Sequence, residues 1–347
     1  MALIDIGSQK QLFADDYLIE SLSSTRQVVN AAEKVEQNPV VRQDRPWEGN
    51  HVCAKAVFFD AEEQRFKMWY TTYWYRVRRE GDAIVVDEDF DEYAAQRLCL
   101  ATSNDGIHFA KHDCTPVCRF TGGRSILTPT LLRHADGSLC REQGRLRLWF
   151  SSCDFPSGDT RHTLHQTTSA DGITWDTPSN EQLENAYAPT IIKEDGRYKL
   201  WFTDVGQEPW CMRYAESSDG KTWQVTPEPV LVVDQPWERH RLFYPTVVKI
   251  AGQYWMWYGS YSQHGGEEMR TALGCAYSDD GLQWQKDPQN PIFGPDESRD
   301  WESHYTTSQS VLRLDDGSLR IWYASRPAPP FEHKYFAIGT ARWPDAP

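Results

Sequence analysis

The segment Ser169-Ala-Asp171-Gly172-Ile-Thr-Trp175 decides the fold, because close copies of it stand at three other places in the chain. The copies are Ser103-Asn-Asp105-Gly106-Ile-His-Phe109, Ser217-Ser-Asp219-Gly220-Lys-Thr-Trp223 and Ser278-Asp-Asp280-Gly281-Leu-Gln-Trp284. Asp-Gly between alternating apolar segments is typical of a hairpin turn in which Gly takes a positive φ. Each copy is therefore predicted to join two antiparallel strands, with the aromatic residue folding back over the turn.

A second element, an aromatic strand, stands upstream of each turn and occurs five times. It covers Phe66–Tyr70, Leu146–Phe150, Tyr198–Phe202, Tyr254–Tyr258 and Leu319–Tyr323. A strand that ends in a turn precedes each copy, and a third strand follows it. Each repeat thus predicts four antiparallel strands, and five repeats of this kind predict an all-β, five-bladed β-propeller.

The repeat replaces the two domains that 347 residues would otherwise suggest with a single domain over 1–347. The predicted blades cover 38–113, 114–178, 182–227, 228–288 and 289–343. The last blade stops at Trp343 without its outer strand, whereas the N-terminal run Gln11–Ile19 has strand character and no blade of its own. We therefore expect residues 10–20 to complete the last blade and close the ring, since a linear array would leave exposed sheet edges.

Composition excludes several classes of protein. The formal net charge is −14, which disfavours nucleic acid as a partner, and no apolar stretch is long enough for a membrane span. The eight Cys include one close pair, Cys114 and Cys118, with no second pair to complete a zinc site, so reduced structural thiols are expected. The first residues do not resemble a signal peptide, which predicts a cytoplasmic protein and leaves the oligomeric state open.

Candidate site residues come from aligning the five repeats on their first strands, whose starts usually face the ligand in a propeller. Three repeats carry Trp-Glu followed by His: Trp47-Glu48 with His51, Trp237-Glu238 with His240, and Trp301-Glu302 with His304. Arg124, Glu184 and Arg241 stand at the equivalent positions. The structural alternative is that the Trp-Glu pairs pack within the ring of blades and cap backbone amides.

The ends of the aromatic strands supply one further candidate. Four of the five repeats have a neutral Ser or Thr where the third has Asp204. A charge in a half-buried strand costs desolvation energy unless it is used, which indicates function. Pairing of Asp204 with Arg213 or Arg241 is the structural alternative.

Blade number, the Asp-Gly-x-x-Trp turn and the Trp-Tyr strand together resemble the five-bladed propeller glycosidases of glycoside hydrolase families 43, 32, 68, 117 and 130. The resemblance covers the chain from Gln11 to Trp343. It implies an axial funnel that holds a carbohydrate, with carboxylates on neighbouring first strands. Glycoside hydrolysis uses two carboxyl groups on either side of the scissile bond.

On this resemblance Glu184 is the expected general acid, with Glu48 or Asp204 as base or nucleophile. The side chains expected to hold the sugar are Trp47, His51, Arg124, Trp210, Glu238, His240, Arg241, Trp301, Glu302 and His304. The loops 76–96 and 327–334 are expected to shape the rim of the pocket.

Three alternatives stay open. A phosphorylase of the family 130 kind would use one acid and bind phosphate through Arg124, Arg241 and His240. A non-catalytic propeller would bind a sugar without forming a product. A divalent metal ion in the central channel, held by His51, His240 and His304, is the one cofactor considered.

Overall fold

The computed structural model describes residues 32–45, 48, 51–73, 77–80, 83–86, 97–113, 124–154, 159–263, 270–327 and 337–343. These residues form an all-β structure in which one short 3-10 helix, η5 (Asp300–Glu302), is the only helical element described. No helix in this part of the chain is long and apolar enough to cross a membrane.

Strand pairing divides the described chain into five antiparallel units, numbered here in chain order. Unit 1 consists of β2 (His51–Asp60), β3 (Arg65–Tyr73), β6 (Arg97–Ser103) and β7 (Ala110–Lys111). Unit 2 consists of β8 (Leu127–Leu131), β11 (Arg145–Asp154), β12 (Asp159–Ser169) and β13 (Leu183–Glu184), with β10 (Arg141–Glu142) beside β11. Unit 3 consists of β14 (Ala186–Glu194), β15 (Arg197–Asp204), β16 (Cys211–Ser217) and β17 (Gln224–Val225), with β9 (Arg133–His134) parallel to β14.

Units 4 and 5 share one continuous sheet. Unit 4 consists of β18 (Leu242–Ile250), β19 (Gln253–Gln263), β20 (Arg270–Ser278) and β21 (Gln285–Lys286). Unit 5 consists of β22 (Tyr305–Arg313), β23 (Leu319–Arg326), β24 (Ala337–Trp343) and β1 (Glu33–Lys34). A separate hairpin pairs β4 (Val77–Glu80) with β5 (Ala83–Val86).

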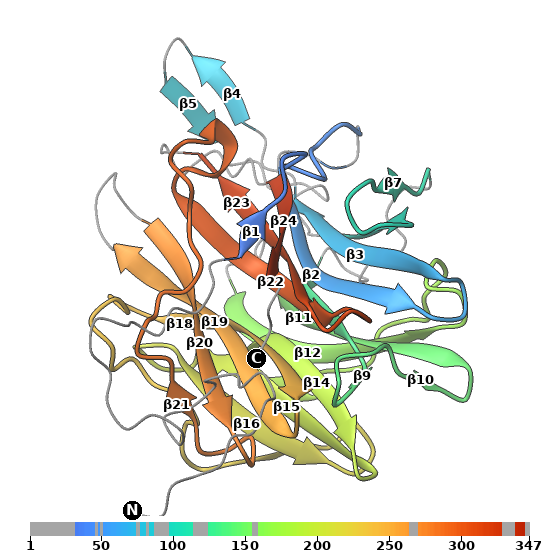
Figure 1. The fold of residues 1–347 in the computed structure, drawn as a ribbon. Helices are drawn as coiled ribbons and strands as arrows, with labels where there is room; N and C mark the ends of the chain where they lie inside the picture. Colours follow the sequence, from blue (N-terminus) through green and yellow to red (C-terminus); the bar gives the residue numbers. More distant parts are fainter. Residues whose placement is uncertain are drawn as a thin grey trace, which may run out of the picture.

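The first strands of the units contact one another in a cyclic order. β2 contacts β8 and β22, β14 contacts β8 and β18, and β18 contacts β22. In Figure 1 the units follow one another in chain order from blue to red, and the red β24 lies beside the blue β1. The ends of the described chain therefore meet in unit 5.

The outer strand of unit 5 comes from a different segment than the sequence predicted. β1 pairs with β24 through Glu33 opposite Arg342 and Lys34 opposite Ala341. The predicted strand Gln11–Ile19 lies outside the described residues. An N-terminal segment does complete this unit. On the described part of the β24 edge that segment is Glu33–Lys34, and Lys34 binds the buried Glu302 of the same unit.

The Asp-Gly turns join the third and fourth strands of units 1 to 4 and also connect neighbouring units. In the turn of unit 3, Ser217 Oγ accepts the Gly220 amide at 2.8 Å and Asp219 Oδ1 accepts the Lys221 amide at 2.8 Å. Gly220 has a φ of 69°. Its carbonyl accepts the indole N–H of Trp149 in unit 2 at 3.3 Å.

The same contact links three other pairs of units. Trp69 binds Gly172 O at 2.8 Å, Trp201 binds Gly281 O at 2.8 Å, and Trp322 binds Gly106 O at 2.9 Å. In its described residues unit 5 has no Ser-x-Asp-Gly turn after its third strand to offer Trp257 of unit 4, and the buried Trp257 Nε1 has no hydrogen-bond partner in this part of the chain. The ring of Trp343 lies 6.3 Å from that of Trp257 instead.

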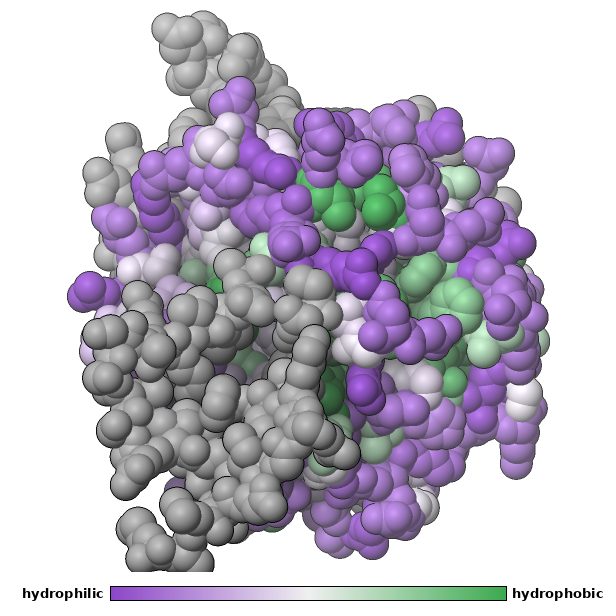
Figure 2. All heavy atoms as spheres, viewed as in Figure 1, coloured by the Kyte–Doolittle hydropathy of each residue, from purple (hydrophilic) through white to green (hydrophobic). Residues whose placement is uncertain are grey.

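The core lies between the units and is made largely of these aromatic strands. Trp69, Trp149, Trp201, Trp257 and Trp322 are among the largest fully buried side chains. Over the face drawn in Figure 2, the described surface is mostly hydrophilic, with smaller hydrophobic areas between the charged groups. Cys53, Cys99, Cys140, Cys153, Cys211 and Cys275 are buried and free, as expected, whereas Cys114 and Cys118 lie outside the described residues.

Candidate functional site

Three tyrosines from neighbouring first strands gather where those strands begin, and we call them the tyrosine cluster: Tyr187, Tyr244 and Tyr305. The hydroxyl groups of Tyr187 and Tyr244 are 2.6 Å apart, and their rings are 5.3 Å apart. Burial raises the pKa of all three phenols, so they are neutral hydrogen-bonding groups at pH 7. Each side chain nevertheless keeps some exposure, which is the combination expected for groups that line a recess.

A repeated backbone irregularity places these residues. Thr128, Ala188, Tyr244 and Ser308 have positive φ values of 44°, 52°, 57° and 50° at equivalent positions of β8, β14, β18 and β22. The pairing of each strand with its neighbour shifts register at this point, as in a β-bulge. Bulges reorient side chains next to functional sites in many proteins. In three strands the bulged residue precedes Pro-Thr, a repeated sequence signal that the initial alignment did not use.

Trp210 and Arg241 form a wall beside the tyrosine cluster. The guanidinium of Arg241 lies 4.2 Å from the centre of the Trp210 ring, and the Trp210 ring lies 6.0 Å from that of Tyr187. Arg241 Nε also donates to Glu208 Oε2 at 2.9 Å. Both residues were predicted to bind substrate, and the structure brings them together next to Tyr187.

His162 completes this wall and was not predicted from sequence. Its ring lies 4.3 Å from that of Tyr187, and burial lowers its pKa to about 4, so it is neutral at pH 7. No repeat motif marks His162, because it stands near the start of a third strand, where no equivalent histidine occurs in the other units.

Two further arginines face the same end of the molecule. Arg124 donates from Nε to Ser152 Oγ at 3.2 Å and from Nη2 to Thr163 Oγ1 at 3.1 Å. The guanidinium of Arg326 lies 4.1 Å from the centre of the Tyr305 ring. Arg124 was predicted as a ligand-binding residue, and its half-buried position next to hydroxyl groups of β11 and β12 suits that role.

The three carboxylates predicted to be catalytic have different surroundings. Glu184 lies on β13, its side chain is 61% exposed, and it is 3.7 Å from Arg161. Asp204, at the end of β15, accepts from Arg213 Nε at 2.6 Å and from the Gly206 amide at 2.8 Å. The structure therefore uses Asp204 in the ion pair that was its structural alternative, and leaves Glu184 exposed.

Glu48 is fully buried in a hydrogen-bond network and does not face a solvent-accessible site. Its carboxylate accepts from the amides of Asp44 at 2.9 Å and Arg45 at 3.0 Å, from the Tyr70 hydroxyl at 2.7 Å and from Lys111 Nζ at 2.7 Å. Four donors on two oxygens leave little capacity for a substrate. The structure therefore gives Glu48 the amide-capping role that was its structural alternative.

The other two Trp-Glu copies repeat this network. Glu238 accepts from Tyr258 at 2.7 Å and from Lys286 at 2.6 Å. Glu302 accepts from Tyr323 and Lys34, both at 2.8 Å. In all three units the partner lysine comes from the outer strand of the same unit, so the three glutamates attach the fourth strand to the aromatic strand. The substrate-binding role predicted for Glu238 and Glu302 stays a prediction.

The tryptophans of this motif are also structural where they are described. The ring of Trp301 stacks on Tyr323 at 6.0 Å and 26° and covers Gly339. Trp237 packs on Tyr258 and covers Gly274 in the same manner. A Cβ on either glycine would lie 2.6 Å from the indole, which explains the small residue there. Sugar stacking by Trp301 stays a prediction, and Trp47 lies outside the described residues.

The three histidines proposed for a metal ion are not brought into a common site by the described residues. His304 Nδ1 lies 2.9 Å from Ser303 Oγ, His240 packs 5.9 Å from Tyr261, and the side chain of His51 is not described. No group of three His, Cys, Asp or Glu side chains in the described ranges could hold a metal ion. The arrangement thus gives no support to a divalent ion in the channel.

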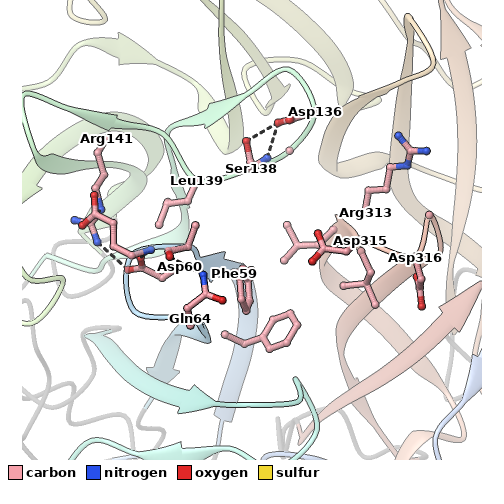
Figure 3. Close-up of a pocket in the computed structure, with 17 residues that line it drawn as sticks. Phe59, Asp60, Gln64, Asp136, Ser138, Leu139, Arg141, Arg313, Asp315 and Asp316 are labelled. Carbon is pink, nitrogen blue, oxygen red and sulfur yellow. Dashed lines mark hydrogen bonds and ion pairs between the residues drawn. The ribbon is translucent and has the colours of Figure 1, made fainter.

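A cavity of about 1110 Å³ lies at the opposite ends of the first strands (Figure 3). It is bordered by the turns that follow β2, β9 and β22, with Phe59, Leu139 and Leu312 among its apolar residues. Its acidic residue Asp60 is paired with Lys67 at 3.0 Å and with Arg141 at 2.8 Å. None of the residues predicted to act on a substrate lies here.

Comparison with known proteins supports the fold. No family model matches the chain. Two curated proteins of Mycobacterium tuberculosis, "Uncharacterized protein MT1551" and "Uncharacterized protein Rv1502", are each 26% identical over 148 residues, which is 39% of this chain and 48% of theirs. The match thus spans about half the length of those relatives.

Solved structures match nearly the whole chain. A protein described as "Glycoside hydrolase" has a TM-score of 0.66 at 13% identity and covers 91% of both chains. A structure described as "The GH130 family of mannoside phosphorylases contains glycoside hydrolases that target beta-1,2 mannosidic linkages in Candida mannan" has a TM-score of 0.64 at 16% identity, over 93% of this chain and 95% of that one. An N-acetylgalactosamine deacetylase from F. plautii, in complex with blood group B trisaccharide, has a TM-score of 0.63 at 16% identity, over 90% and 94%.

The class that emerges is an all-β protein with the fold of these glycoside hydrolase structures. The resemblance inferred from the repeats is thereby confirmed at the level of the fold. Identities of 13–16% show the fold alone.

Proposed function

We propose that this protein is a carbohydrate-active enzyme, a glycoside hydrolase, built as a five-bladed β-propeller. The five units would be the blades, with their first strands around the axis. Two observations support a closed ring. The first strands contact one another in a cyclic order, and Lys34 of β1 binds a buried Trp-Glu glutamate, as Lys111 and Lys286 do in units 1 and 4.

The substrate would bind at the tyrosine cluster and its wall. The observation that carries the proposal is the grouping of Tyr187, Trp210 and Arg241, which joins an aromatic surface to fixed hydrogen-bond donors. Sugars present apolar C–H faces and a rim of hydroxyl groups, and this pairing of groups matches both. Neutral phenols and a neutral His162 add donors and acceptors without the desolvation cost of a charge.

Glu184 is the proposed general acid, because it is the one exposed side chain of the three carboxylates first considered. It would donate a proton to the leaving oxygen, and hydrolysis needs a second carboxyl group across the bond. Asp204 and Glu48 are not proposed for that second role, since their oxygens are engaged with Arg213 and Lys111.

The test is a screen of the purified protein against aryl glycosides and oligosaccharides, followed by variants on the substrate found. Glu184→Gln should lower kcat by about 100-fold or more, the usual contribution of a general acid. Glu216→Gln is the matched control, because Glu216 is another partly exposed glutamate that pairs with an arginine, Arg197, on the third strand of its unit. Equal activity of the two variants would contradict the role of Glu184.

A phosphorylase is the second candidate, and the cationic groups at the site favour it. Arg124, Arg241 and Arg326 all lie at the end where the first strands begin, and guanidinium groups bind phosphate well. Release of a sugar 1-phosphate that depends on added inorganic phosphate would select this reaction. Binding of a sugar by wild-type protein, with no product under either condition, would select a non-catalytic sugar-binding role.

A further inference from the structure

Lys55 crosses the space between the first strands. It belongs to β2, whose neighbours around the ring are β8 and β22, yet its Nζ donates to Pro245 O at 2.7 Å and to Thr246 Oγ1 at 3.0 Å on β18. The residue is 2% exposed. The third N–H of the Lys55 ammonium group donates no hydrogen bond to the described residues.

Arg133 is a second cation buried in the same region. It is 1% exposed, and its Nε and Nη1 have no hydrogen-bond partner among the described residues. Its guanidinium lies 4.9 Å from the centre of the Phe58 ring, which is on the same strand as Lys55. Burial lowers the pKa of Arg133 to about 10, so the group still carries its full charge at pH 7.

The charge of this region is not balanced by the protein. Among the described residues no carboxylate forms an ion pair with Lys55 or Arg133, whereas the buried or nearly buried Lys67, Lys111 and Lys286 each have one. Cation–π contact with Phe58 supplies about 0.5–2 kcal/mol, which is less than the several kcal/mol that burial of an ion costs. Burial and the Arg133 charge both lower the pKa of Lys55.

We propose that Lys55 and Arg133 form the walls of a buried binding site for a small monovalent anion of the halide kind, such as chloride. The anion accepts from Arg133 Nε and Nη1 and from the remaining Lys55 proton. The anion supplies the acceptor that the buried Arg133 Nε and Nη1 lack, and its negative charge favours the protonated form of Lys55.

The surroundings select for a small ion. The hairpin after Arg133 covers this end of the first strands, with Ala135 O bound to the Lys249 amide at 2.7 Å and Gly137 close to Val248. The adjacent cavity carries Asp60, Asp136 and Asp315, which disfavour the approach of multiply charged anions. A halide at this position would stabilise the centre of the ring, independently of any substrate.

Crystals of the wild-type protein soaked in sodium bromide test the site directly. The expected result is an anomalous bromide peak in contact with both Arg133 and Lys55. Bromide peaks confined to the protein surface would overturn the proposal.

Thermal unfolding at constant ionic strength provides the solution test. Replacing sodium gluconate by sodium chloride should raise the Tm of the wild-type protein by about 2 °C for each tenfold increase in chloride above its dissociation constant. Arg133→Met should abolish this response, or Lys55→Met if the first variant does not fold. Arg145→Met is the control that should keep it, because Arg145 is an exposed arginine paired with Asp176. Identical Tm values in chloride and gluconate would overturn the proposal.

Discussion

Replacing Lys34 by Met should destabilise the protein more than removing any exposed ion pair. Lys34 Nζ lies 2.8 Å from Glu302 Oε2, and the exposed fractions of the two side chains are 12% and 0%. The lysine also donates to Gly294 O at 2.9 Å. Without it, the buried Glu302 carboxylate keeps the Tyr323 hydroxyl and an Arg299 nitrogen at 3.7 Å.

Breaking a buried pair by removing one partner costs about 3–5 kcal/mol, because an uncompensated charge remains. The partial exposure of Lys34 and the nearby Arg299 place the expected loss at the lower end, about 3 kcal/mol. For a chain of this size that corresponds to a fall in Tm of about 4 °C. The loss should be smaller at pH 5 than at pH 7, because burial already raises the pKa of Glu302 and removing Lys34 raises it further. Protonation at lower pH then relieves the unpaired charge.

The assay is urea unfolding of four proteins: wild type, Lys34→Met, Glu302→Gln and the double variant. The double variant should be less destabilised than the sum of the single variants by about 2 kcal/mol, which measures the coupling of the pair. Arg197→Met is the control, since Arg197 and Glu216 are 49% and 34% exposed and should contribute about 1 kcal/mol or less. A loss in Lys34→Met no greater than in the control, or simple additivity, would refute the assigned role of β1.

Four further outcomes are expected. Lysine, arginine and tyrosine partners hold the pKa values of Glu142 and Glu194 at about 2. The free energy of unfolding should therefore fall as the pH drops from about 4.5 toward 2. Glu142→Gln should reduce the difference in urea midpoint between pH 7 and pH 3. Gly220→Ala should cost about 2–4 kcal/mol of unfolding free energy, because φ is 69° and a Cβ would lie 2.7 Å from Arg147. The control Gly144→Ala should cost about 1 kcal/mol, because φ is 74° but no atom lies within 4 Å of the added Cβ. Asp204→Asn should lower Tm about as much as Arg213→Gln and leave kcat within about twofold; a selective loss of kcat would restore Asp204 as a catalytic candidate. Trp210→Ala should weaken carbohydrate binding, measured by calorimetry, by about tenfold or more with an unchanged circular dichroism spectrum, and unchanged affinity would move the site elsewhere.

The repeating elements could be predicted from sequence because their signals are local. The Ser-x-Asp-Gly turn contains its own hydrogen bonds, as Ser217 and Asp219 show, and the aromatic strand alternates visibly. The turn also links neighbouring units, which its own sequence does not predict. The carbonyl of Gly220 binds a tryptophan 71 positions earlier in the chain, in another unit.

The candidate site was harder to predict because repeated charges have two explanations. Trp-Glu recurs at the starts of first strands, which suggested a ligand ring, but Glu48 needs Lys111, a residue 63 positions away, to complete its network. Asp204 was singled out by the neutral residues in other repeats, and its partner Arg213 is equally specific to that unit. Arg241 was selected by its position before a first strand, and its contact with Trp210 could not be predicted because the two residues lie 31 positions apart in the chain.

The completion of unit 5 by β1 also sets the order in which the chain folds. Lys34 and Glu302 are separated by 268 positions, and closing a loop of that length costs about 5 kcal/mol of chain entropy before any contact forms. Units 1 to 4 consist of contiguous strands and can form as the chain leaves the ribosome, whereas the last unit waits for its own C-terminal strand. Until β1 of the same chain pairs with it, the edge of β24 is open, and at high concentration the β1 strand of a second molecule competes for it. Refolding at increasing protein concentration should therefore yield strand-exchanged dimers joined at this unit.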